Sequence, residues 1–290
     1  MKKKILFIVN PISGGLDKAF FPSLLDQYLD LHQFDAEIIF SEYSGHAKEL
    51  AAQALANNFD IVAAVGGDGT INEVASELES SGKIMGIIPC GSGNGLARTL
   101  GISLNNAKAI QQINKLTTTA IDTGIFNDKK FFNMAGMGFD AHISALFAQN
   151  HTRGFKGYVK TTLTEIAKYK PQNYVIEIDG RRISRQAFML SIANSSQFGN
   201  NAHLSPTASV KDGWLDVCLI KPFSIWVFPS LVYRMFAKST DKSNYVEIVK
   251  GREVKITREA SGPIHLDGEP FIMDKSLKIS IKHLSLTLIV

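Results

Sequence analysis

A short apolar strand, a glycine-rich loop and a helix follow one another without a break between residues 61 and 79. Ile61–Val65 is continuously apolar, as is typical of a strand buried on both faces of a parallel sheet. The loop Gly66–Thr70 reads Gly-Gly-Asp-Gly-Thr, and Ile71–Glu79 has helical periodicity. Three glycines let a ligand approach the backbone closely, and a helix N-terminus offers N–H groups and the positive end of its dipole. The segment therefore predicts a phosphate-binding turn at the carboxyl end of a parallel strand.

The same succession of strand and helix extends over the first 115 residues. Short strands joined by tight turns follow, with an Asp-Gly turn at residues 179–180 that is typical of a hairpin. With 290 residues, the chain is long enough for two domains. We therefore expect an α/β domain over residues 1–122, with a parallel sheet covered by helices on both faces, and a mainly antiparallel β-sandwich over residues 123–290. Predicted elements include strands Ile5–Asn10, Ala36–Phe40, Met85–Pro89, Arg181–Ile192, Leu277–Ile281 and Leu284–Ile289, and helix Leu16–Leu31.

Two further loops end strands of the predicted parallel sheet. Gly91–Gly95 follows Met85–Pro89 with the sequence Gly-Ser-Gly-Asn-Gly, and Asn10–Gly15 ends the first strand. Ligands bind at the carboxyl ends of the strands in open α/β sheets, so the three loops together predict one nucleotide site. Since an acidic side chain repels bare phosphate, we expect Asp68 to act through Mg²⁺ or a ribose hydroxyl. The plainer alternative is a set of glycine-rich turns that bind nothing.

Composition restricts the partners and the compartment. The formal net charge of +4, from 31 basic and 27 acidic residues, fits nucleotide phosphates or an acidic lipid surface and is too small to indicate nucleic acid. Cys90 and Cys218 lie far apart and form neither a disulfide framework nor a zinc-binding pattern. No apolar run reaches the roughly 18 residues of a membrane span, and the short run after Met1–Lys4 fits a buried strand better than a signal peptide. We therefore predict a cytoplasmic protein, with peripheral contact to the inner face of the membrane left open.

Motifs in order along nearly the whole chain resemble the diacylglycerol kinase catalytic family, which includes bacterial lipid kinases and is related to sphingosine kinases. The two glycine-rich loops and the opening Asn-Pro-x-Ser-Gly carry the resemblance in the first domain, and Asn133–Ala141, Asp212–Asp216 and Leu266–Pro270 carry it in the second. The resemblance implies a first domain similar to NAD kinases and phosphofructokinases. It also implies an enzyme of phospholipid biosynthesis that transfers the γ-phosphoryl group of ATP to a hydroxyl of a lipid such as diacylglycerol.

The resemblance further implies roles for individual residues. Glu269 would be the general base for the acceptor hydroxyl, with Asp267 beside it and Asp68 in the nucleotide loop as further catalytic residues. Whether Asp267 or Glu269 takes the proton stays open. Residues two apart in an extended segment face the same side, and the longer side chain of Glu269 reaches further. The implied ATP-binding residues are Asn10, Ser41, Gly66, Gly67, Asp68, Gly69, Thr70, Ile71, Asn72, Ser92, Gly93 and Asn94.

A metal site and a helix of uncertain environment complete the expectations. The resemblance implies that Ser209, Asp212 and Trp214 hold a structural Mg²⁺, in addition to the Mg²⁺ that accompanies ATP. Pro222–Phe236 has apolar residues at helical spacing, which fits either a core helix or an interfacial helix that dips into a membrane. The expected partners are ATP, a lipid with a free hydroxyl and, transiently, a membrane surface, with no nucleic acid; a homodimer is left open.

Two other functions stay open on the sequence. NAD kinases and phosphofructokinase-like enzymes use related Gly-Gly-Asp-Gly loops, so a kinase of a soluble acceptor is one alternative, although the Ser-Gly-Asn-Gly loop favours the lipid family. A non-catalytic nucleotide- or lipid-binding protein is the other, and the presence of Asp68, Asp267 and Glu269 argues against it.

Overall fold

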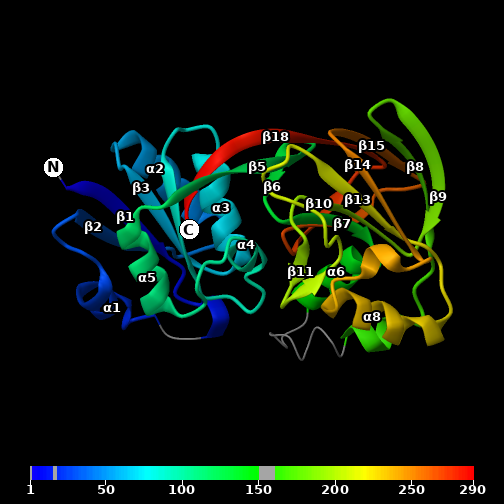
Figure 1. The fold of residues 1–290 in the computed structure, drawn as a ribbon, viewed down its shortest axis with the longest axis horizontal. Coiled ribbons are helices and arrows are strands. Elements are labelled where there is room, and N and C mark those ends of the chain that lie inside the picture. The colour runs from blue at the N-terminus through cyan, green and yellow to red at the C-terminus, as the bar shows by residue number, and fades with distance from the viewer. Residues whose placement is uncertain (1, 16–17, 150–160) are drawn as a thin grey trace. The chain divides into compact units, whose positions relative to one another are not determined.

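The structure, a computed structural model, describes residues 2–15, 18–149 and 161–290 (Figure 1). The chain forms two compact units: unit 1 comprises Met1–Ile121 and Leu284–Val290, and unit 2 comprises Asp122–His283. The first boundary lies one residue from the expected one, but the C-terminal residues, expected in the second domain, belong to unit 1. The reason is that β18 (Ser276–Ile289) pairs antiparallel in unit 2 and then parallel with a strand of unit 1, with a positive φ of 46° at Leu284.

Unit 1 is built on a parallel sheet in the order β2-β1-β3-β4. The direction in which strands are added reverses at β1. Because crossover connections are right-handed, α1 covers one face of the sheet and α2 and α3 cover the other. The strands are β1 (Lys3–Val9), β2 (Phe34–Phe40), β3 (Ile61–Gly66) and β4 (Ile84–Pro89); the helices are α1 (Phe21–Tyr28), α2 (His46–Ala56), α3 (Asp68–Leu78), α4 (Gly95–Thr99) and α5 (Asn106–Lys115).

Helix α1 is shorter than its apolar periodicity predicts. It occupies Phe21–Tyr28 within the predicted Leu16–Leu31, of which residues 16 and 17 lie outside the described residues. Pro22 stands in the first turn, where proline is tolerated because the N–H that it lacks has no partner inside a helix. Phe21 is buried, and its ring centroid lies 5.9 Å from that of Phe7 in β1. The predicted apolar face of the helix therefore does cover the sheet.

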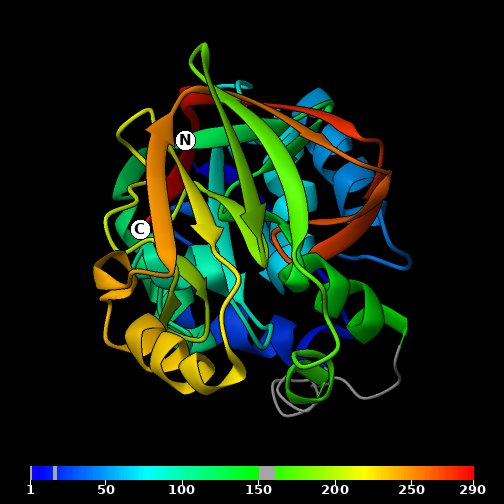
Figure 2. The ribbon, with the colours of Figure 1, turned by 90° about the vertical axis from the view of Figure 1, so that its right-hand side faces the viewer.

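Unit 2 is a sandwich of two antiparallel sheets that pack face to face on one core; its strands run from green to orange in Figure 2. One contains β15, β8, β9 and the first part of β18, and the other runs in the order β14-β13-β10-β7-β16-β17. Tyr174 and Ile176 of the first sheet share one core with Leu190 and Ile264 of the second. The strands are β5 (Thr118–Phe126), β6 (Lys129–Phe131), β7 (Met134–Gly138), β8 (Gln172–Ile178), β9 (Arg181–Ala187), β10 (Met189–Ala193), β11 (Gln197–Gly199), β12 (Ala202–His203), β13 (Leu215–Ile220), β14 (Val246–Gly251), β15 (Glu253–Arg258), β16 (Gly262–Leu266) and β17 (Glu269–Met273).

The predicted strand Arg181–Ile192 is in fact two strands in different sheets. Exposed and partly buried residues alternate along most of β9, whereas every residue of β10 is buried. Phe188 lies between the two strands. A half-exposed edge strand and a central strand have different patterns, and this change within one run was the signal that the prediction overlooked.

Two helices and a second core cover the outer face of the sheet that runs from β14 through β10 to β17. Helices α6 (Phe139–Gln149) and α8 (Phe228–Phe236) contribute Phe139, Ile143 and Leu231 to this core, where they join Met189 of β10. Among the helices of the described residues, none combines the length and the apolar character needed to span a bilayer.

Candidate functional site

The four parallel strands of unit 1 end level with one another. Val9 at the end of β1 lies opposite Phe40 of β2 and Val65 of β3, and Gly66 lies opposite Pro89 of β4. The residues predicted to bind ATP begin at or shortly after these positions, at Asn10, Ser41, Gly66 and Ser92. Four segments that are far apart in the sequence therefore start from one edge of one sheet, as ligand sites in open α/β sheets do.

The loops pack backbone against backbone, which explains their glycines. A Cβ on Gly91 would lie 2.7 Å from the Cα of Gly67, and one on Gly14 would lie 1.9 Å from the carbonyl oxygen of Cys90. Real Cβ atoms do not approach so closely, so any side chain at Gly14 or Gly91 would force the loops apart. The three predicted loops are therefore one assembly.

Asp68 joins the two glycine-rich loops through its carboxylate. Its Oδ2 accepts a hydrogen bond from the N–H of Asn94 at 2.8 Å, and its Oδ1 accepts one from the N–H of Gly95 at 2.9 Å. Asp68 is the first residue of α3, while Asn94 is the N-cap of α4. We expected Asp68 to act through Mg²⁺ or ribose, and the sequence held no sign that it positions the neighbouring loop. The carboxylate satisfies N–H groups that the start of α4 leaves without helical partners.

Further side-chain contacts hold the same assembly. Asn94 has a left-handed φ of 51° and bonds both the N–H and the carbonyl of Gly91 with its amide. The amide of Asn10 donates to Thr70 Oγ1 at 3.0 Å, which ties the loop after β1 to α3. The first N–H groups of α3 point out of the helix without an intrahelical acceptor, and they are the natural donors for an anion.

The other predicted ATP residues divide by exposure. Ser92 is exposed at the tip of its loop, whereas the side chains of Ile71 and Ser41 are buried. The side chain of Ile71 is therefore out of reach of a ligand, and its N–H donates to the carbonyl of Gly67 at 3.0 Å. Asn72 and Gly93 are half-buried.

In unit 2, Asp267 anchors the turn between β16 and β17. Its carboxylate accepts hydrogen bonds from the N–H groups of Phe132, Asn133 and Met134, each at 2.9 Å. Asp267 and Gly268 have φ values of 49° and 92°, as the two central residues of a type I′ hairpin require. The tight turn that an Asp-Gly pair indicates is therefore present. The extended geometry behind the argument that both carboxylates face one side is absent, so they need not do so.

Glu269 differs from Asp267 in its surroundings. It is the first residue of β17, pairs with Leu266 across the hairpin, and is exposed. The two carboxylates of the turn therefore differ: three main-chain donors engage the half-buried Asp267, whereas Glu269 is exposed.

A buried polar cluster joins β16 of this hairpin to α6 and β10, and it escaped the sequence analysis. Asp140 Oδ2 accepts from Ser191 Oγ at 2.9 Å and lies 3.0 Å from Nε2 of His265. All three side chains are buried, and a Cβ on Gly136 would lie 2.1 Å from Asp140 Oδ2. Asp140 was noted only as part of a motif, and the signal for His265 is its place between the apolar residues of a strand. The cluster supports the strand that precedes Asp267.

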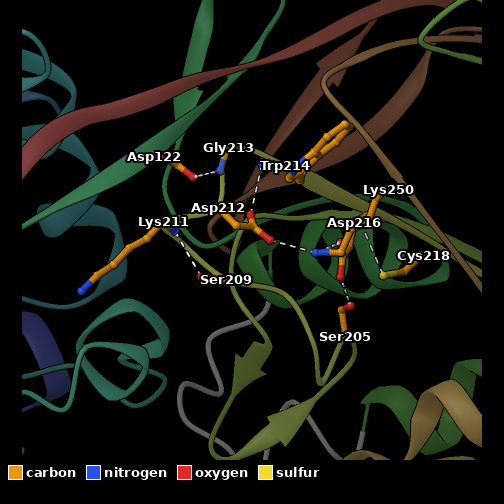
Figure 3. Close-up of polar contacts among 10 residues, drawn as sticks. All are labelled: Asp122, Ser205, Ser209, Lys211, Asp212, Gly213, Trp214, Asp216, Cys218 and Lys250. Atoms are coloured by element: carbon orange, nitrogen blue, oxygen red, sulfur yellow. Dashed lines mark hydrogen bonds and ion pairs between the residues drawn. The ribbon is translucent and has the colours of Figure 1, made fainter.

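The loop predicted to hold Mg²⁺ contains an ion pair instead (Figure 3). Asp212 Oδ2 lies 2.8 Å from Lys250 Nζ, and Asp212 Oδ1 accepts from the N–H of Trp214 at 3.1 Å. Lys250 also lies 3.6 Å from Oδ1 of the buried Asp216. Partial burial lowers the pKa of Lys250, but the hydrogen bond to Asp212 and the charges of the two carboxylates outweigh it, so the pKa is raised above its ordinary value.

These residues do not fit a magnesium site as they lie. Mg²⁺ requires a near-octahedral shell of oxygen ligands at about 2.0–2.1 Å. Asp212 is the one carboxylate among Ser209, Asp212 and Trp214, and it already pairs with an ammonium group, while Ser209 Oγ accepts from the N–H of Lys211 at 3.3 Å. Over the described ranges, the side chains of His, Cys, Asp and Glu form no group of three or more that could hold a metal ion. The positive charge beside Asp212 comes from Lys250.

Comparison with known sequences bears on both units. The diacylglycerol kinase catalytic domain matches residues 4–126, and the YegS C-terminal NAD kinase beta sandwich-like domain matches residues 133–288. The chain is 27% identical over 283 residues to a diacylglycerol kinase of Bacillus subtilis, which covers 92% of this chain and 90% of that protein. It is 31% identical over 244 residues to a protein of Yersinia enterocolitica named probable lipid kinase YegS-like, with 82% and 81% covered.

Solved structures share the fold. A structure described as a diacylglycerol kinase from Bacillus anthracis superimposes with a TM-score of 0.77 at 23% identity, over 99% of this chain and 96% of that one. An NAD kinase from Archaeoglobus fulgidus, in complex with ATP, gives a TM-score of 0.53 at 14% identity, over 100% and 94%. The NAD-kinase-like α/β unit and the β-sandwich expected from the sequence are thereby confirmed. With both domain families matched in order along one chain, this protein belongs to the family of diacylglycerol kinase-like and YegS-like lipid kinases.

Proposed function

We propose that the protein transfers the γ-phosphoryl group of ATP to a hydroxyl of a lipid such as diacylglycerol. Family membership supports a phosphotransferase, and a relative named diacylglycerol kinase favours that acceptor. The observation that carries the proposal is the assembly of glycine-rich loops at the strand ends of unit 1, which Asp68 holds together through the N–H groups of Asn94 and Gly95. An NAD kinase of similar fold binds ATP, which favours ATP as the donor.

Unit 1 would hold the phosphates in this reaction. Phosphoryl transfer depends on positioning and charge neutralisation more than on covalent chemistry by the protein. The start of α3, from Gly67 to Thr70, presents main-chain N–H groups, and Ser92 adds a hydroxyl from the second loop. Mg²⁺ bound to ATP would supply the remaining positive charge. The role of Asp68 is to keep the loops in register, so that the donors converge.

Unit 2 would supply the proton acceptor. As the acceptor oxygen forms its bond to the γ-phosphorus and the bond to ADP breaks, the hydroxyl proton passes to the carboxylate of Glu269. Asp267 positions this group, because it ties the hairpin to residues 132–134 through three hydrogen bonds. The division of roles follows from the exposure of Glu269 and from the three main-chain hydrogen bonds that Asp267 accepts.

A panel of acceptors tests the proposal. The protein is incubated with radiolabelled ATP, Mg²⁺ and, separately, diacylglycerol, other hydroxyl lipids, NAD and sugar phosphates. We expect label in a lipid and none in NAD or sugars. Label in NAD would support the alternative function, a kinase of a soluble acceptor, which the similar fold of the A. fulgidus NAD kinase suggests. ATP binding without transfer to any acceptor would support a non-catalytic binding protein. The cytoplasmic location and the homodimer stay predictions.

A further inference from the structure

Large apolar side chains are exposed together on one short segment of unit 2. The segment consists of a 3₁₀ turn at Ile225–Val227 and helix α8, at the periphery of the unit in Figure 2. Trp226 is 88% exposed, more than any other large apolar side chain of the described residues, and Tyr233 is 72% exposed. Ile225 and Phe236 are also exposed. We call these four side chains, three of which are aromatic, the aromatic face.

The other side of this segment is fixed in the fold. Leu231 of α8 is buried, and Val227, Phe228 and Phe223 pack on the second core of unit 2. The orientation of the helix is therefore set by packing, and the exposed side chains are those that point away from the core. Trp226 lies in the 3₁₀ turn that leads into α8, and Tyr233 lies in α8 itself; both side chains are more than two-thirds exposed, at 88% and 72%. The sequence left two environments open for this segment, and the structure contains both: one side is core and the other faces solvent.

The charged side chains within the segment and the residues that lead into it are all basic. Residues 217–240 contain no acidic residue, while Lys221, Arg234 and Lys238 lie in or beside the segment. Asp241 comes next and is exposed, and Lys242 follows it. Arg234 donates to the carbonyl of Ser239 and still brings its charge to the C-terminal end of α8. Basic residues beside an apolar face complement an anionic surface.

We infer that the aromatic face docks unit 2 onto an anionic lipid bilayer. Tryptophan and tyrosine combine a large apolar ring with a hydrogen-bonding group, which suits the boundary between headgroups and acyl chains. A helix held on one side by the core can insert only its outer side chains, so the contact is shallow and reversible. The inference rests on the proposed function in one respect: an enzyme whose acceptor is a membrane lipid must reach the bilayer surface.

Vesicle binding without ATP tests the inference. The intact protein is sedimented with vesicles of phosphatidylcholine alone and of phosphatidylcholine with phosphatidylglycerol. We expect binding to the anionic vesicles that weakens as salt is raised. The double variant Trp226→Ser, Tyr233→Ser should bind at least about tenfold more weakly, because the free energy gained by transferring two aromatic rings from water to the bilayer is lost. Leu31→Ser, which changes a 45% exposed apolar side chain of unit 1, is the matched control and should bind as the wild type does.

Tryptophan fluorescence locates the contact. The chain has two tryptophans, and Trp214 is half-buried under the guanidinium of Arg252 at 4.3 Å. Anionic vesicles should shift the emission of the wild type to the blue and leave that of Trp226→Phe unshifted, although this variant still sediments. Unchanged melting temperatures of all variants would show that they fold.

The outcomes separate the inference from the proposed function. Equal vesicle binding by the wild type and the double variant overturns the inference, as does binding to neither vesicle. If such a protein still phosphorylates a dispersed short-chain diacylglycerol, the proposed function stands without the docking surface. If vesicles are bound through Trp226 and no lipid is phosphorylated, the docking stands and the function fails. Dimerisation that buries Trp226 in solution, measured by sedimentation, would assign the aromatic face to a second copy and also overturn the inference.

Discussion

Replacing Asp267 with asparagine should show whether Asp267 holds the β16–β17 turn in place or acts as the general base. The native carboxylate accepts three main-chain hydrogen bonds, two at Oδ1 and one at Oδ2. Asparagine also tolerates the positive φ of 49° at this position, so the turn itself is kept. The amide oxygen can still accept from Asn133 and Met134, but an NH₂ group now faces the N–H of Phe132. The change therefore tests the hydrogen bonds and the charge alone.

The magnitude follows from those contacts. One main-chain donor without an acceptor costs about 1–3 kcal/mol, and two bonds lose their charge assistance. The half-exposed setting screens part of this loss. We expect a loss of about 2–4 kcal/mol in the free energy of unfolding of unit 2, which for a unit of this size lowers the melting temperature by about 4–16 °C. Turnover should fall moderately, because Glu269 is less well held.

Glu269→Gln is the matched comparison. Glu269 is exposed at the start of β17, so its amide should leave the melting temperature unchanged. It should cut turnover by about 10²–10⁴-fold, the usual contribution of a general base, with ATP affinity preserved. Thermal and chemical denaturation, calorimetric ATP binding and the lipid phosphorylation rate are measured on both variants. The reasoning is refuted if Asp267→Asn melts like the wild type and loses turnover while Glu269→Gln keeps it, since Asp267 would then be the base.

Three other variants address the remaining contacts. Asp68→Asn leaves one N–H at the start of α4 without its acceptor and should weaken ATP binding by about 1–3 kcal/mol in calorimetry. The control Asp35→Asn changes an exposed residue and should bind ATP as the wild type does. Equal affinities of both variants would show that the hydrogen bonds of Asp68 to Asn94 and Gly95 are not needed for binding. Gly91→Ala forces its Cβ against Gly67 and should reduce ATP affinity about tenfold or more without unfolding unit 2; native affinity would show that the loops can separate freely. Lys250→Met removes the ammonium group beside the buried carboxylate of Asp216 and should lower the free energy of unfolding by about 1–2 kcal/mol. Millimolar Mg²⁺ should raise the melting temperature of this variant more than that of the wild type. A wild type that melts at a lower temperature in EDTA would contradict the ion-pair assignment.

Local features of the sequence determined much of unit 1. Continuous apolar runs mark strands buried on both faces, and glycines directly after them mark turns that must approach another backbone. These are properties of neighbouring residues, so the order of strands and helices and the edge that carries the loops could be predicted. The β-sandwich followed from alternation and turns in the same way. The run Arg181–Ile192 nevertheless forms two strands, because apolar character alone does not tell which of two sheets a residue joins.

Tertiary structure alone decided which groups meet. The carboxylate of Asp68 finds its donors in the next loop, and that of Asp267 finds them 133 to 135 residues away. Lys250 lies 38 residues from Asp212 in sequence, and it neutralises the carboxylate that the family resemblance had assigned to Mg²⁺. The last strand likewise ends in unit 1 and not in unit 2 only because its end pairs with β4. Local periodicity reports which face of an element is buried, whereas a hydrogen-bond partner or an ion pair depends on where distant elements come together, and only the folded chain determines that.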